Sequence, residues 1–88
     1  MQVHIIFKGI VQGVGFRERT RRMARSLHVF GWIRNNPDGT VEAIFKGSPE
    51  SVEKLIQYCE NGIPDAIVTE KIMEYQEEGN FEDFKILK

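Results

Sequence analysis

The spacing of apolar residues changes abruptly across a glycine-rich segment, and this change restricts the possible folds more than any other feature. Before the segment, Val3, Ile5 and Phe7 recur at every second position, which is the period of a strand buried on one face. After it, apolar and small residues recur at helical spacing and predict a helix from Phe16 to about His28. The chain is therefore expected to begin with a strand, a loop over residues 9–15 and a helix.

The remainder of the chain repeats this order with one hairpin inserted. Residues 29–35 and 41–46 are predicted strands, and the segment Asn36-Pro37-Asp38-Gly39 joins them, because Asp-Gly tolerates the positive φ angles of a tight turn. Ser48 and Pro49 are typical of a helix start, and Gly62 followed by Pro64 is typical of its end. Two more strands are predicted over residues 66–75 and 84–87.

The predicted order of elements is β-α-β-β-α-β with a short terminal strand. Crossovers through helices and one tight hairpin give the split βαβ arrangement, an α+β ferredoxin-like sandwich in which two helices cover one face of an antiparallel sheet. The 88 residues suffice for one domain, predicted to span residues 1–88. Because this fold hosts enzymes, metal carriers, ligand binders and RNA binders, function has to be argued from a site.

Charge and composition narrow the possible partners. With 12 basic and 13 acidic residues the net charge is −1, so neither nucleic acid nor a membrane is expected as a partner. The single cysteine, Cys59, excludes an intramolecular disulfide and a paired-cysteine metal site. No apolar stretch approaches the roughly 18 residues that span a membrane, and the first residues lack the pattern of a signal peptide. We expect a cytoplasmic protein, and a monomer.

The loop over residues 9–15 is the main candidate site. Glycines such as Gly13 and Gly15 let successive backbone N–H groups turn toward one point, and the helix that follows adds the positive end of its dipole. Arg17 falls in the first turn, where its guanidinium can grip two phosphate oxygens. On these grounds alone a ligand-free glycine bend is an equal alternative. A solvated helix face is the expectation for the rest of this arginine run: Arg19, Arg21, Arg22 and Arg25.

Longer motifs favour a binding loop over a simple bend. The segment GIVQGVGFR at residues 9–17 resembles the first signature of the acylphosphatase family, and GWIRN at 31–35 with DGTVE at 38–42 resembles the second. A weaker third block is similar at Gly62, Pro64, Ala66 and Val68. The resemblance covers nearly the whole chain, in order and at family spacing. It implies an enzyme that hydrolyses acyl phosphates, the mixed anhydrides of a carboxylic acid and phosphate, with no metal and no cofactor.

The resemblance also implies the roles of individual residues. Asn35 would orient the attacking water. Arg17 would hold the substrate phosphate together with backbone groups of the loop, so the implied phosphate-binding set is Gln12, Gly13, Val14, Gly15, Phe16 and Arg17. Three positions depart from the family pattern. His28 stands where many members have glycine, Ile63 replaces a common proline, and Glu18 places a carboxylate beside the phosphate site, where it could weaken affinity.

Two other functions remain open. The first is a binding module that captures a phosphorylated small molecule, such as carbamoyl phosphate, inside a larger enzyme; turnover of acetyl or benzoyl phosphate would distinguish it. The second is RNA binding by the sheet, which the fold and the arginine run suggest, although the aromatic strand pattern of RNA-binding sheets is missing. Structural roles are expected for His4, His28, Asp38 and Cys59. The side chains of Phe16 and Trp32 are expected to form core or site wall rather than to bind a ligand.

Overall fold

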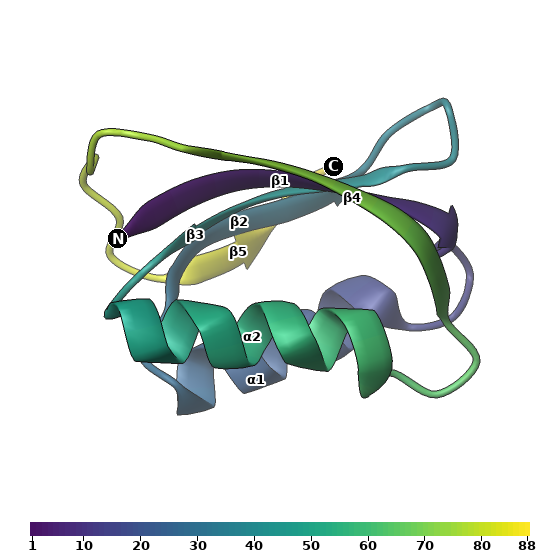
Figure 1. The fold of residues 1–88 in the computed structure, drawn as a ribbon, viewed down its shortest axis with the longest axis horizontal. Helices are drawn as coiled ribbons and strands as arrows, with labels where there is room; N and C mark the ends of the chain where they lie inside the picture. Colours follow the sequence, from purple (N-terminus) through teal and green to yellow (C-terminus); the bar gives the residue numbers. More distant parts are fainter.

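Two helices lie side by side against one face of a five-stranded sheet (Figure 1). The computed structural model describes residues 1–88. The elements in chain order are β1 Gln2–Ile10, α1 Phe16–Ser26, β2 Phe30–Asn35, β3 Val41–Lys46, α2 Pro49–Asn61, β4 Ile67–Tyr75 and β5 Phe84–Ile86. The predicted β-α-β-β-α-β order with a short terminal strand is confirmed, and the fold is the ferredoxin-like α+β sandwich.

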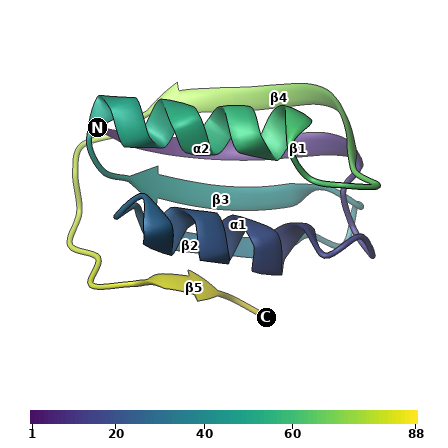
Figure 2. The same cartoon turned by 90° about the horizontal axis from the view of Figure 1, so that it is seen from below.

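The strands lie in the order β4-β1-β3-β2-β5. The pairs β4–β1, β1–β3 and β3–β2 are antiparallel, as expected, but β5 pairs with β2 in parallel. The predicted antiparallel sheet is therefore confirmed for the four longer strands, and the short β5 makes the sheet mixed. After β4 the chain crosses to the opposite edge of the sheet before it forms β5 (Figure 2), so β5 reaches β2 running in the same direction.

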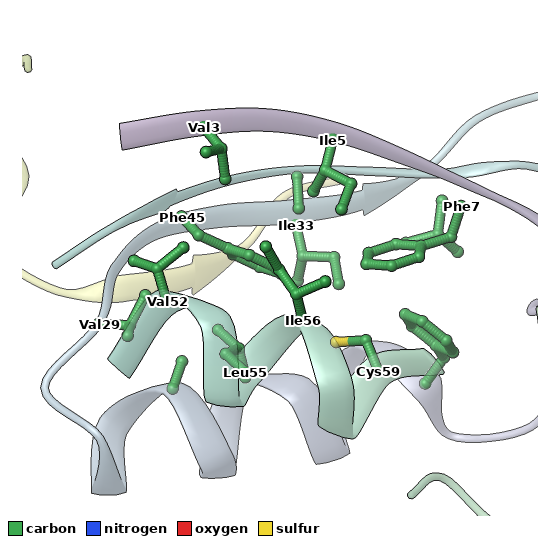
Figure 3. Close-up of a cluster of buried hydrophobic side chains, with 14 of the residues drawn as sticks. Val3, Ile5, Phe7, Val29, Ile33, Phe45, Val52, Leu55, Ile56 and Cys59 are labelled. Carbon is green, nitrogen blue, oxygen red and sulfur yellow. The ribbon is translucent and has the colours of Figure 1, made fainter. Parts of the chain in front are cut away.

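The core lies between the sheet and the two helices (Figure 3). Val3, Ile5 and Phe7 face it from β1, as their alternation predicts, and their exposed fractions are 1% or less. The apolar stripe of α2 is buried at all four positions, namely Val52, Leu55, Ile56 and Cys59. Each fully buried apolar side chain of this size contributes about 1.5–3 kcal/mol to stability. This packing fixes the helices on the sheet and thereby the position of the first turn of α1.

The two helices begin differently. At α2, the Ser48 side chain accepts a hydrogen bond from the backbone N–H of Ser51, and Pro49 occupies the first helical position, as predicted. At α1, the residue before the helix is Gly15 in a left-handed conformation, and no side chain caps the helix.

The other end of α1 is at Ser26, two residues before the predicted end, and His28 adopts a φ of 58°. Neither helix is long and apolar enough to cross a membrane.

Candidate active site

The loop between β1 and α1 and the turn between β2 and β3 lie at the same end of the sheet (Figure 2). A cavity of about 210 Å³ opens there. Its lining consists of Val11, Gly13, Gly15, Phe16, Arg17, Glu18, Asn35 and Ile86. The fold thus brings Arg17 and Asn35 to one cavity together with Gly13, Gly15 and Phe16. Gln12 and Val14 are not part of the lining.

The glycines of the loop serve two different purposes. Gly13 and Gly15 have φ angles of 76° and 75°, and a Cβ atom on Gly13 would meet nothing within 4 Å. These two residues are needed for the left-handed backbone, which glycine adopts at little cost. Gly9 is different, because a Cβ atom there would lie 2.1 Å from the carbonyl oxygen of Ile67 in the neighbouring strand. Gly9 therefore serves strand packing, and Gly13 and Gly15 shape the cavity.

The uncapped N-terminus of α1 faces the candidate site. The first N–H groups of any α-helix have no partner within the helix and carry a partial positive charge. At α2 one of them is satisfied by Ser48, whereas at α1 no side chain takes this place. Gly15, Phe16, Arg17 and Glu18, which form the start of this helix, all line the cavity. An anion is the ligand that such a helix end favours.

Arg17 is the half-buried cation of the cavity. Its neighbours in the arginine run are engaged elsewhere, because Arg21 and Arg22 bind Glu18 and Arg25 binds Asp83. The ion pairs of this run leave Arg17 and the exposed Arg19 without a carboxylate. The expectation of a simple solvated face is thus refined, since three of the arginines hold carboxylates and Arg17 is free to bind an anion in the cavity.

Asn35 reaches the cavity because of its register on β2. It lies two residues after Ile33, so both side chains are on the face of the sheet that the helices cover, and Ile33 is fully buried there. The Oδ1 atom of Asn35 is buried and has no hydrogen-bond partner in the protein. Leaving a buried acceptor unsatisfied costs about 1–3 kcal/mol. A molecule bound in the cavity that donates a hydrogen bond would remove this cost.

Glu18 lies at the edge of the cavity, as the sequence suggested, but it is not a free carboxylate. Its oxygens accept hydrogen bonds from Arg21 at 2.5 and 2.6 Å and from Arg22 at 3.1 Å. The hydrogen bonds from Arg21, followed by those from Arg22, lower the pKa of Glu18 to about 2. Glu18 is thus ionised at neutral pH, and its two cationic partners more than offset its charge.

The other candidates have structural surroundings. Burial raises the pKa of the Cys59 thiol to about 12, and its sulfur contacts the hydroxyl of Thr20. His4 lies on the helix-free face of the sheet and binds the carboxylate of Glu42. Asp38 accepts hydrogen bonds from the backbone and the hydroxyl of Thr40 in the β2–β3 turn. No group of three or more His, Cys, Asp or Glu side chains is placed to hold a metal ion.

Fold and cavity together define a class of protein: a small α+β sandwich with a cavity where its first helix begins. The acylphosphatase sequence pattern matches residues 3–86. An acylphosphatase of Pelotomaculum thermopropionicum is 49% identical over 86 residues, which cover 97% of this chain and 94% of the relative. The crystal structure of the Bacillus subtilis acylphosphatase superposes with a TM-score of 0.93 at 31% identity, covering 99% of this chain and 98% of that one. The chain belongs to the acylphosphatase family, and its enzyme class is hydrolase.

A larger protein contains a similar unit. Full-length HypF, solved in its phosphate- and nucleotide-bound form, matches 99% of this chain with a TM-score of 0.88 and 29% identity. The match covers only 12% of the HypF chain. The same unit therefore occurs both as a small acylphosphatase and as part of a much longer protein.

Proposed function

We propose that this chain hydrolyses the bond between a carboxylate and phosphate, with Arg17 and the backbone amides of residues 12–17 holding the phosphate and Asn35 orienting the water. The observation that carries the proposal is the buried, unpartnered Oδ1 atom of Asn35, a residue that lines the same cavity as Arg17. A water molecule can donate a hydrogen bond to this atom and keep its oxygen lone pairs free for attack on phosphorus. Arg17 supplies the only cationic side chain in the lining.

The chemistry needs few groups because acyl phosphates carry a good leaving group. The water oxygen forms a bond to phosphorus while the phosphorus–oxygen bond to the acyl group breaks, and the carboxylate leaves with the electron pair. Since the conjugate acid of a carboxylate has a pKa of about 4, this group leaves without a proton. A phosphate oxygen takes the proton of the water. Positioning and charge stabilisation then supply most of the catalysis, as is general for phosphoryl transfer.

The cavity has an apolar side on which the acyl group can lie. Val11 and Phe16 are buried in its wall, and Ile86 of β5, which is 36% exposed, also lines it. The lining has two charged side chains. Arg17 would bind the phosphate, and Glu18 is already paired with an arginine. This lining supports small, uncharged acyl groups as the substrate class.

The experiment compares Asn35→Ala with the unaltered protein on benzoyl phosphate. Because Asn35 would hold a neutral water while Arg17 and the loop hold the anion, kcat should fall by about 10²-fold with little change in inhibition by inorganic phosphate. Asn35→Asp should in addition weaken phosphate binding, since it places a negative charge near the substrate. An Asn35→Ala protein with native kcat would refute the role of Asn35. Activity should persist after exhaustive chelation, and loss in chelator reversed by a divalent ion would contradict the metal-free mechanism.

The match to a segment of HypF keeps a phosphate-binding module as the second candidate. The two functions differ in turnover, so a protein that binds inorganic phosphate but releases no product from acetyl or benzoyl phosphate would favour the module. The monomeric state, the cytoplasmic location and the single domain over residues 1–88 stay predictions, and sedimentation analysis tests the first of them.

A further inference from the structure

The side chain of Gln12 joins the phosphate loop to the β2–β3 turn. Its Nε2 atom donates to the carbonyl oxygen of Asn36 at 2.8 Å and to that of Thr40 at 2.9 Å. A side-chain amide nitrogen carries two hydrogens, so both are used on the turn. The side chain therefore has no N–H left for a phosphate, so the phosphate-binding role implied for Gln12 rests on its backbone N–H group.

The turn that Gln12 holds is already braced from within. The backbone N–H of Asn36 donates to Thr40 at 2.9 Å, and its side chain donates to the Thr40 hydroxyl at 3.1 Å. Asp38 accepts from the backbone N–H and the hydroxyl of Thr40 at 3.0 and 2.6 Å. The turn thus behaves as one unit. Gln12 supplies the hydrogen bonds that join this unit to residues 11–15.

The position of Gln12 in the chain gives this link a consequence for the site. Gly13, which lines the cavity, follows Gln12 directly, and Asn35, which also lines it, directly precedes Asn36. The two hydrogen bonds therefore set the distance between the loop amides and the Asn35 side chain. Attack on phosphorus depends on that distance, because a displacement of about 1 Å can cost about 10²-fold in rate.

We propose that Gln12 is a positioning residue that holds Asn35 in register with the phosphate loop. This inference rests on the proposed role of Asn35 and adds a residue that acts through it. Gln12 affects the placement of the water, while the anion stays bound to Arg17 and the loop.

The test is a double-mutant cycle on kcat with Gln12→Ala, Asn35→Ala and the double variant, using benzoyl phosphate. Gln12→Ala should lower kcat at least about tenfold, within the range expected for a misplaced group. In the Asn35→Ala background the same change should lower kcat less than about twofold, because residues that act as a unit are not additive. The inhibition constant of inorganic phosphate should stay within about twofold of the native value in all three variants.

Two further variants separate positioning from folding. Gln12→Met keeps the length of the side chain and removes both donors, so it should reproduce the kcat loss even if Gln12→Ala folds poorly. Asn36→Ala is the matched control, because it removes a hydrogen bond inside the turn and leaves the two bonds from Gln12 in place. It should lower the melting temperature without a comparable loss of kcat.

The outcomes distinguish the two proposals. Equal losses of kcat from Gln12→Ala in both backgrounds, or a parallel weakening of phosphate inhibition, would overturn the positioning role and leave that of Asn35 intact. Native kcat in Asn35→Ala would overturn both. A kcat loss that is present with Asn35 and absent without it supports the inference.

Discussion

Gly15→Ala isolates the contribution of the phosphate loop because its structural cost is small and can be worked out. Gly15 has φ 75° and ψ 19°, and an added Cβ atom would have Arg19 Nε as its nearest neighbour at 4.0 Å. No steric clash therefore adds to the cost of the left-handed backbone, which is about 1–2 kcal/mol. Alanine regains about 0.4–1 kcal/mol by restricting the unfolded chain. The net loss of about 1 kcal/mol should lower the melting temperature by about 4–8 °C.

The effect on phosphate binding should be larger than this stability loss suggests. Gly15 lines the cavity at the start of α1, so strain in its left-handed backbone would displace the first helix amides that line the cavity. Losing one hydrogen bond to a charged group costs about 1.5–3 kcal/mol. Since about 1.4 kcal/mol corresponds to tenfold in affinity, phosphate should inhibit about 10- to 100-fold more weakly.

Gly39→Ala is the matched control for this experiment. Gly39 also has a positive φ, 91°, and an added Cβ atom would meet nothing within 4 Å, but it lies in the β2–β3 turn and outside the cavity lining. Its backbone cost should be similar and its phosphate affinity unchanged. Competitive inhibition by inorganic phosphate and thermal unfolding, measured on the same preparations, provide both values. Equal phosphate affinity in Gly15→Ala and Gly39→Ala would show that Gly15 is an ordinary bend residue.

Two further predictions concern charged residues of α1. Arg17→Ala should lower kcat/KM by at least about 10²–10³-fold, the range for losing one preorganised donor, and Arg17→Lys should restore little because lysine cannot present a planar fork; near-native turnover in steady-state assays would contradict this role. Glu18→Gln should lower the melting temperature at neutral pH. The folded pKa of Glu18, about 2, lies below its ordinary 4.5, so its stabilising effect is present above pH 4.5 and lost as the pH falls toward 2. Melting temperatures of both proteins from pH 2 to 7 should therefore converge at the acidic end, and a constant difference would refute the assignment.

The sequence predicted the features that depend on neighbours in the chain. The alternation in β1, the apolar stripe of α2 and the Ser48 cap follow from periods of two or 3.6 residues and from local hydrogen bonds. The pairing of Glu18 with Arg21 and Arg22 spans only three and four residues, so it too is a contact within one element. Such interactions form within one element, so the order of residues suffices to predict them.

Features that depend on distant segments escaped prediction. Phe84–Ile86 has only three residues, too few to indicate whether its partner strand is parallel or antiparallel. Arg25 and Asp83 are 58 residues apart, and only the packing of α1 against β5 brings them together. Gln12 belongs to the implied phosphate loop through its backbone, while its side chain binds carbonyl groups 24 and 28 residues away. The position of its backbone was predictable, but the direction of its side chain was not.

The candidate site is recognisable physically as the place where the fold leaves hydrogen-bonding capacity unused. The N-terminus of α2 is capped and that of α1 is not, while the Oδ1 atom of Asn35 is buried without a partner. Groups left unsatisfied in this way cost stability, and they persist at functional sites because a ligand completes them. Asn35→Ala should therefore leave the melting temperature unchanged or raise it, since it removes an acceptor that the free protein does not satisfy. If Asn35 served only to stabilise the turn, the same substitution would lower the melting temperature and spare kcat, so measuring both separates a functional asparagine from a structural one.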